Sequence, residues 1–332
     1  MTGRNRDAAQ LDGHAAHGAP ATPGTHQQLA GFLAANRVEV LDVTRGAAAG
    51  TRRLLLGEPG ARFASHVVAV ADHPSSASAI EAEIRVLEAL RAGTAPTVVT
   101  TLPRIITPAI VGDRPAVVMT AVPGMRPGRR RRRPQPMARA DLTAVSSWLG
   151  TLWSGTGGPA DSVDLGRYGA DLLFARYCGS SRLAPTLGAV HRARHRLEPL
   201  HVARTAVHGC LCPRHAYVRE GVVGGVDDWG LASPSGEPLR DLGGFAVRYA
   251  GSRLPEVVAG RTMHAHLLRD FVMAGLRAAG LPSRRWRDVL LLAQVEKAAK
   301  ALERGQVDEI RLLAATAVAL PQDQRRQEAA QI

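Results

Sequence analysis

The feature that most constrains this chain is a block of three short motifs between residues 208 and 242. The first motif is His208-Gly-Cys-Leu-Cys-Pro-Arg-His, the second is Val226-Asp-Asp-Trp-Gly, and the third is Arg240-Asp-Leu. Between the first two motifs, the apolar residues of segments 216–218 and 222–226 predict a short β hairpin. The block therefore places histidine, cysteine and carboxylate side chains beside one small hairpin.

The elements around this block predict an α+β protein with two lobes. Five strands are predicted, with one helix after the third strand and helices dominating the rest of the chain. The strands cover residues 38–44, 52–56, 67–71, 104–106 and 116–120; helices are predicted over 28–35, from 76 onward, and over 140–152, 169–178, 189–197, 261–279 and 283–304. We expect a disordered tail over residues 1–27, a small antiparallel β-sheet lobe over 28–120 and a larger, mainly helical lobe over 121–332.

Charge and composition limit the classes of partner. The formal net charge is +13, and arginine supplies nearly all of the positive charge because Lys297 and Lys300 are the only lysines. The arginine bias, with abundant alanine and glycine, is typical of a GC-rich genome. We do not expect nucleic-acid binding, because aromatic residues make up only 4% of the chain and no nucleic-acid-binding motif is present. Five consecutive arginines predict either a solvated loop or a docking surface for an acidic protein or peptide; they are Arg129, Arg130, Arg131, Arg132 and Arg133.

The location is predicted from what the sequence lacks. No apolar run is long enough to cross a bilayer, and the first residues lack the apolar core of a secretion signal. Three cysteines are an odd and sparse set, so a disulfide framework is not expected. We therefore expect a cytoplasmic protein without a membrane partner.

The motif block resembles the catalytic core of the aminoglycoside phosphotransferase and choline-kinase-like family, which has the two-lobed protein-kinase-like fold. The family pattern is His-Gly-Asp, four residues, Asn, and then Ile-Asp-Trp or Ile-Asp-Phe. The resemblance implies that Asp228, before Trp229, is the magnesium aspartate, and that Asp241 is a structural aspartate that supports the catalytic loop. It also implies that Glu83 is the glutamate that pairs with a lysine of the third strand.

The reacting groups of that family are replaced in this chain. Cys210 stands at the catalytic aspartate position and His215 at the metal-binding asparagine position. The only asparagines are Asn5 and Asn36, so no alignment supplies the missing amide. A thiol accepts a hydroxyl proton only as a thiolate, and the loss of a general base typically slows a reaction by about 10² to 10⁴.

The third-strand lysine is also absent, since no lysine precedes Lys297. Ala69 or Val70 stands where that lysine is expected, and the nearest basic candidates are Arg62 and His66. Phosphoryl transfer depends on positioning and on stabilisation of the phosphate oxygens by a cation and magnesium. Conventional kinase activity is therefore not expected.

The His208-to-His215 segment leaves three interpretations open. The four side chains could be structural, with His208 packed near Asp241; they could bind zinc as His208, Cys210, Cys212 and His215; or Cys210 could be a nucleophile with an imidazole beside it. Asp227 and Asp228 could hold one magnesium ion with ATP, or could be solvated. Residues 46–50 form a small-residue loop that could cover phosphates.

The sequence thus favours a degenerate member of the family, a pseudokinase, that acts as a binding or accessory subunit for a peptide, protein or small molecule. Kinase-fold proteins of this kind resemble accessory proteins of bacterial secondary metabolism, which is an analogy of fold. The alternative is an active enzyme. It would be a divergent ATP- and Mg²⁺-dependent phosphotransferase using Arg62, Asp227 and Asp228, or a fold reused for thiol- or zinc-assisted chemistry at Cys210.

Overall fold

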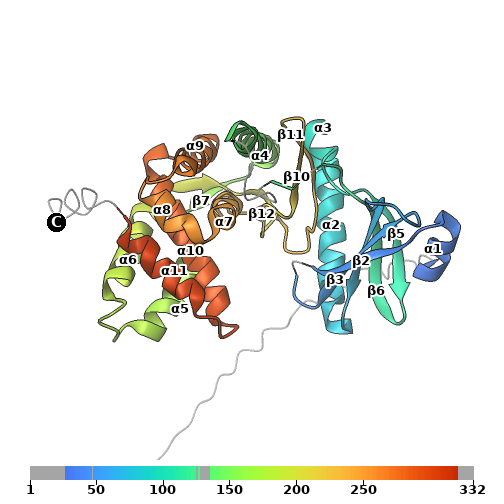
Figure 1. Cartoon of the computed structure of the whole chain (residues 1–332), viewed down its shortest axis with the longest axis horizontal. Coiled ribbons are helices and arrows are strands. Elements are labelled where there is room, and N and C mark those ends of the chain that lie inside the picture. Colours follow the sequence, from blue (N-terminus) through green and yellow to red (C-terminus); the bar gives the residue numbers. More distant parts are fainter. Residues whose placement is uncertain (1–26, 47, 125, 128–134, 321–332) are drawn as a thin grey trace, which may run out of the picture.

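The computed structural model describes residues 27–46, 48–124, 126–127 and 135–320. In Figure 1 a β-sheet with a helix on each side forms one end of the molecule, and most of the other helices gather toward the opposite end. The predicted tail and the arginine run from Arg129 to Arg133 lie outside the described residues, apart from residue 27. No helix in the described ranges is both long enough and apolar enough to cross a membrane.

The sheet of the small lobe has the strand order β1-β5-β6-β4-β3-β2. Its strands are β1 (Gln27–Gln28), β2 (Glu39–Arg45), β3 (Thr51–Gly57), β4 (His66–Ala71), β5 (Ile105–Val111) and β6 (Arg114–Thr120). The five predicted strands are confirmed, and each pairs antiparallel with its neighbours. The two-residue strand β1 adds a short parallel pairing on β5.

The two faces of the sheet bury different partners, as the alternation of side chains along a strand requires. On strand β4, Val68 and Val70 pack in a small cluster with Leu29 and Phe32 of helix α1 (Leu29–Asn36). Ala69 and the other inward residues face helix α2 (Ala77–Gly93) and belong to the main core. Figure 1 shows α2 between the sheet and the rest of the molecule, so this helix connects the small lobe to the functional block.

The large lobe is mainly helical, as predicted. Its helices and short turns are α3 (Pro96–Val99), α4 (Gln135–Thr156), α5 (Arg167–Tyr177), α6 (Ala184–Leu197), α7 (Pro238–Ala250), α8 (Leu254–Val258), α9 (Met263–Ala278), α10 (Trp286–Leu302) and α11 (Asp308–Val318). The sequence did not predict α7, α8 or α11. Helix α7 contains two consecutive glycines, which are poor helix formers. It forms because Pro238 occupies its first turn and because its apolar face, including Leu242 and Phe245, is fully buried.

Short strand pairs lie between these helices. They are β7 (Ala160–Ser162) with β8 (His201–Ala203), β9 (Thr205–Val207) with β12 (Ser233–Gly236), and β10 (Ala216–Arg219) with β11 (Val222–Val226). The β10–β11 pair is the predicted hairpin. It packs closely against the segment that follows β6, since a Cβ atom added at Gly225 would lie 2.2 Å from Val122 Cβ. This contact holds the hairpin, and with it the motif block, against the connection between the lobes.

Candidate functional site

The loop from His208 to Leu211 is shaped by one buried carboxylate. Asp241, in the first turn of α7, accepts hydrogen bonds from the backbone N–H groups of His208 at 2.6 Å, Gly209 at 3.0 Å and Leu211 at 3.4 Å. Gly209 has a φ of +80°, and a Cβ atom there would lie 2.0 Å from the Leu231 carbonyl oxygen. A glycine is therefore required at this turn, and the carboxylate fixes the direction of the residues after it.

His208 itself is a buried structural group. Its ring packs on Trp229, with centroids 4.9 Å apart, and stacks on His215 at 5.3 Å. Its Nε2 lies 2.7 Å from the Asp227 carbonyl oxygen, so Nε2 donates in the tautomer that satisfies this contact. With that tautomer, Nδ1 accepts from the Cys210 backbone N–H at 3.4 Å. Both ring nitrogens of His208 are thus engaged within the protein.

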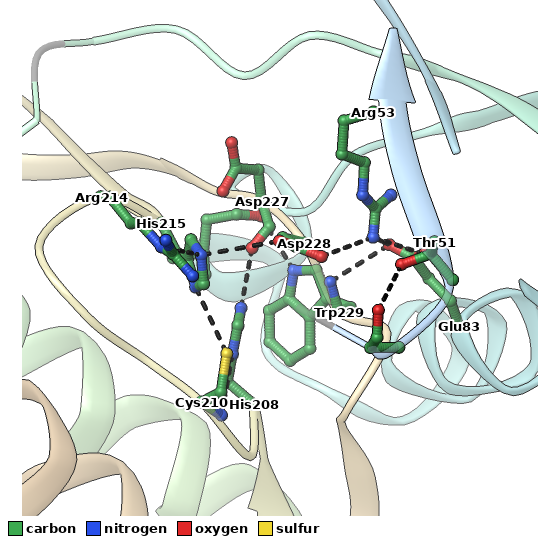
Figure 2. Close-up of polar contacts among 12 residues, drawn as sticks. Thr51, Arg53, Glu83, His208, Cys210, Arg214, His215, Asp227, Asp228 and Trp229 are labelled. Atoms are coloured by element: carbon green, nitrogen blue, oxygen red, sulfur yellow. Dashed lines mark hydrogen bonds and ion pairs between the residues drawn. The ribbon is translucent and has the colours of Figure 1, made fainter. Parts of the chain in front are cut away.

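Cys210 and His215 face each other across the loop, with 3.6 Å between Sγ and Nδ1 (Figure 2). Burial raises the pKa of the Cys210 thiol to about 12, and the nearby Arg248 guanidinium offsets only part of that rise. Burial also lowers the pKa of His215 to about 3. The pair is therefore a neutral thiol beside a neutral imidazole at pH 7, not the thiolate–imidazolium pair of an activated nucleophile.

Arg53 on strand β3 occupies the centre of the site. Its Nη2 donates to Glu83 of helix α2, at 2.7 Å from Oε2 and 2.9 Å from Oε1, and to Asp228 Oδ1 at 2.7 Å. The three side chains are almost inaccessible to solvent, with 6%, 1% and 8% of their surfaces exposed. Figure 2 shows the guanidinium reaching from the sheet to the segment that carries Asp228 and Trp229. One arginine thus joins strand β3, helix α2 and the second motif.

The sheet register explains how this arginine replaces the missing lysine. Arg53 is the cross-strand partner of Ala69, one of the two positions at which the lysine was expected. The cation therefore enters the same region from the neighbouring strand. The nearest basic candidates in the sequence, Arg62 and His66, lie elsewhere: Arg62 is exposed, and the His66 ring packs edge-on against Phe32. Sequence alone did not reveal Arg53 because the inward face of β3 depends on the register.

The two aspartates of the second motif have different partners. Asp228, which has the unusual φ of +64°, contacts Arg53 and lies 3.5 Å from His215 Nε2. Asp227 instead accepts a hydrogen bond from the Tyr217 hydroxyl at 2.8 Å, and burial raises its pKa to about 6. In turn, Arg126 donates to the Tyr217 oxygen from Nη2 at 2.7 Å and from Nε at 3.1 Å. Sequence reasoning did not identify Tyr217 or Arg126, because neither belongs to a family motif.

The loop between β2 and β3 lies directly on the second motif. Ala48 is buried at 4% exposure, and a Cβ atom at Gly230 would lie 3.2 Å from the Ala48 Cβ and 3.7 Å from Arg53 Nη2. This is the small-residue loop that the sequence suggested as a phosphate cover. In the structure it is in van der Waals contact with the turn after Asp228, beside the Arg53 side chain.

Neither metal suggested by the sequence suits these contacts. His208, Cys210 and His215 have ligand atoms within 4.8 Å of one another, which is the right chemistry for zinc. However, both nitrogens of His208 are hydrogen-bonded, His215 Nε2 accepts from Arg214 Nε at 2.9 Å, and Cys212 is buried outside the group. For magnesium, the Asp228 carboxylate is already bound to a guanidinium, and an imidazole replaces the oxygen ligand that a hard cation prefers.

The comparisons with known proteins agree with this geometry at the level of fold. Residues 43–279 match the model of a phosphotransferase enzyme family. An apo thermostable mutant of aminoglycoside phosphotransferase APH(4)-Ia is similar in structure, with a TM-score of 0.53 at 14% identity over 85% of this chain and 94% of that chain. ADP-bound aminoglycoside phosphotransferase APH(2'')-Ib gives 0.52 at 14% identity over 88% and 97%. Comparison with curated proteins gives no match.

Proposed function

The chain belongs to the phosphotransferase enzyme family, and from this premise we propose that it binds a ligand without transferring phosphate. In this proposal it is a pseudokinase, an accessory subunit that holds a small molecule, peptide or protein. The observation that carries the proposal is the Arg53 guanidinium between Glu83 and Asp228, at 2.7 Å from each carboxylate.

The Nη2 atom of Arg53 is fully engaged by these two carboxylates. Nη2 of an arginine carries two hydrogens, and here it contacts both oxygens of Glu83 and one oxygen of Asp228. That nitrogen retains no hydrogen for a phosphate oxygen, and of the other two guanidinium nitrogens Nε is buried. The lysine of the family pairs with the glutamate and binds phosphate, whereas this cation also neutralises the metal-binding aspartate. A magnesium ion on Asp228 would stand next to a buried positive charge, which repels it.

The loop residues support the same conclusion. Transfer needs a base near the attacking hydroxyl, and the thiol at that position has a pKa raised to about 12 by burial. His215, with its pKa lowered to about 3, is neutral and already bonded to Arg214. Cys210 thus provides neither the carboxylate of a kinase nor the thiolate of a cysteine enzyme.

The proposal is tested by measuring ADP formation from ATP and Mg²⁺, alone and with an aminoglycoside or a serine-containing peptide as acceptor. The wild-type protein and Asp228→Ala should give the same background rate, and Cys210→Ser should not change it. ADP formation by the wild-type protein that Asp228→Ala abolishes would show that the chain is an active, divergent phosphotransferase. Turnover lost in Cys210→Ser but kept in Asp228→Ala would instead indicate thiol chemistry.

A further inference from the structure

Helices α7 and α10 approach each other closely beside the Cys210 loop and leave a small hollow there. A Cβ atom at Gly243 of α7 would lie 2.7 Å from the Ala293 Cβ of α10, so a larger side chain would force the helices apart. The hollow, of about 50 Å³, lies over Gly244 and Ala293 and is bounded by Gly209 of the Cys210 loop. Three of the residues that line it, Gly209, Gly244 and Ala293, have little or no side chain, and Leu165 also lines it.

Cationic side chains surround this hollow. Arg240 and Arg248 lie eight residues apart on α7, a little over two helical turns, and Lys297 and Lys300 lie three apart on α10, so the two members of each pair lie on the same side of their helix. The only lysines of the chain are thus both found here. Glu296 is the one carboxylate among the lining residues. The hollow repels cationic ligands and attracts anionic ones.

The four cations differ in their ion pairs. Lys297 pairs with Glu309 at 2.8 Å, and Arg240 lies 3.5 Å from an Asp164 oxygen. Within the part of the chain that the structure describes, neither Arg248 nor Lys300 forms an ion pair. Arg248 donates only to the Gly244 carbonyl oxygen of its own helix, at 3.3 Å. Their remaining N–H donors are available to a ligand at the mouth of the hollow.

We propose that this basic hollow, formed by Arg240, Arg248, Lys297 and Lys300, binds an oxyanion group, a phosphate or a carboxylate, of the ligand beside Cys210. Its volume suits one charged group, since pockets that enclose a whole drug-sized ligand measure roughly 300–1,000 Å³. Guanidinium and ammonium groups form their strongest hydrogen bonds with such anions. The inference rests on the proposed function, in which the chain holds a ligand, and it states the charge of that ligand.

The test uses the whole protein with inorganic phosphate and, separately, succinate as probes, at constant ionic strength set with sodium chloride. Each probe is titrated by thermal shift, because a ligand of the folded state raises the melting temperature by mass action. The variant Arg248→Gln/Lys300→Gln removes the two cations that form no ion pair among the described residues, and both positions are exposed. The matched control Arg253→Gln/Arg277→Gln removes the same charge from exposed positions outside the hollow.

We expect at least one probe to stabilise the wild-type protein and the control variant, and Arg248→Gln/Lys300→Gln to bind it roughly tenfold more weakly or worse. A response to phosphate identifies a phosphorylated ligand group, and a response to succinate identifies a carboxylate. If neither probe binds, or if the control variant loses as much affinity as the test variant, the inference is wrong. An ADP assay separates this result from the proposed function. ADP formation that requires Mg²⁺ and Asp228 would overturn the proposed function alone, since binding in the basic hollow needs neither.

Discussion

Replacing Arg53 with methionine tests the central ion-pair cluster most severely. Methionine keeps much of the side-chain length but leaves the carboxylates of Glu83 and Asp228 buried without their cation. Removal of one member of a buried ion pair typically costs about 3–5 kcal/mol. For a chain of this size, about 2 °C in melting temperature corresponds to each kcal/mol, so we expect a fall of roughly 6–10 °C. Arg53→Lys should lower the melting temperature by less, because an ammonium keeps the positive charge, although it lacks the planar arrangement of donors of a guanidinium.

The neighbouring residue provides a matched control. Arg52 lies on the opposite face of β3, is 56% exposed and pairs with Asp72. Arg52→Met should therefore cost no more than about 1 kcal/mol, as is usual for a surface ion pair. Thermal unfolding of both variants, with and without Mg²⁺, makes the comparison. Mg²⁺ should stabilise Arg53→Met, whose two carboxylates have lost their cation, and should leave the wild-type protein unchanged.

Acidification gives a second readout of the same variant. Protonation of one of the two buried carboxylates removes their mutual repulsion. The stability deficit of Arg53→Met relative to the wild-type protein should therefore shrink as the pH falls. The reasoning is refuted if Arg53→Met and Arg52→Met melt at the same temperature. It is also refuted if the Arg53→Met deficit grows on acidification, because the loss would then have another cause.

Three further predictions concern the loop and the second motif. With the pKa of its thiol at about 12, Cys210 should react with iodoacetamide at neutral pH far more slowly than the exposed Cys178, which peptide mass spectrometry would measure; equal labelling would contradict the account. The pKa of Asp227 is about 6 in the folded protein, compared with 3.8 for an unperturbed aspartate. The protonated carboxyl therefore stabilises the fold fully below pH 3.8, and this contribution of about 3 kcal/mol is lost as the pH rises through 6. The stability of Asp227→Asn relative to the wild-type protein should therefore increase between pH 4 and 7. Denaturant unfolding at several pH values measures this, and a difference in unfolding free energy that stays constant with pH would contradict the prediction. Asp241→Ala leaves three backbone N–H groups without their acceptor and should destabilise the protein by about 3 kcal/mol or more, whereas a loss below about 1 kcal/mol would show that the loop does not depend on this carboxylate.

The sequence predicted the fold and much of the composition of the site, because both depend on local patterns. Strand and helix periodicity predicted the five-stranded sheet and most of the helices, and the motif spacing brought Cys210 and His215 to one loop. The absence of a lysine before Lys297 was certain from composition alone. These features do not depend on the exact register of the sheet.

The identity of the replacing cation could not be predicted in the same way. Arg52 and Arg53 are adjacent, and only the pairing of Arg53 with Ala69 places the second of them inside. That register depends on turn geometry and on packing against α2. The alternation of Thr51 and Arg53 on one face of β3 was a usable signal, although it does not say which face is inward. The Tyr217–Asp227 contact likewise joins strand β10 to the residue after β11, in a hairpin whose register shifts after Tyr217.

The most direct test of the central claim is a calorimetric titration of the wild-type protein with ATP, with and without Mg²⁺. The account predicts no binding that depends on Mg²⁺, because Arg53 already neutralises Asp228. Any binding that remains should be independent of the metal and should be lost in Arg248→Gln/Lys300→Gln. Binding that requires Mg²⁺ and disappears in Asp228→Ala would contradict the claim and show that the site still holds a metal–nucleotide complex.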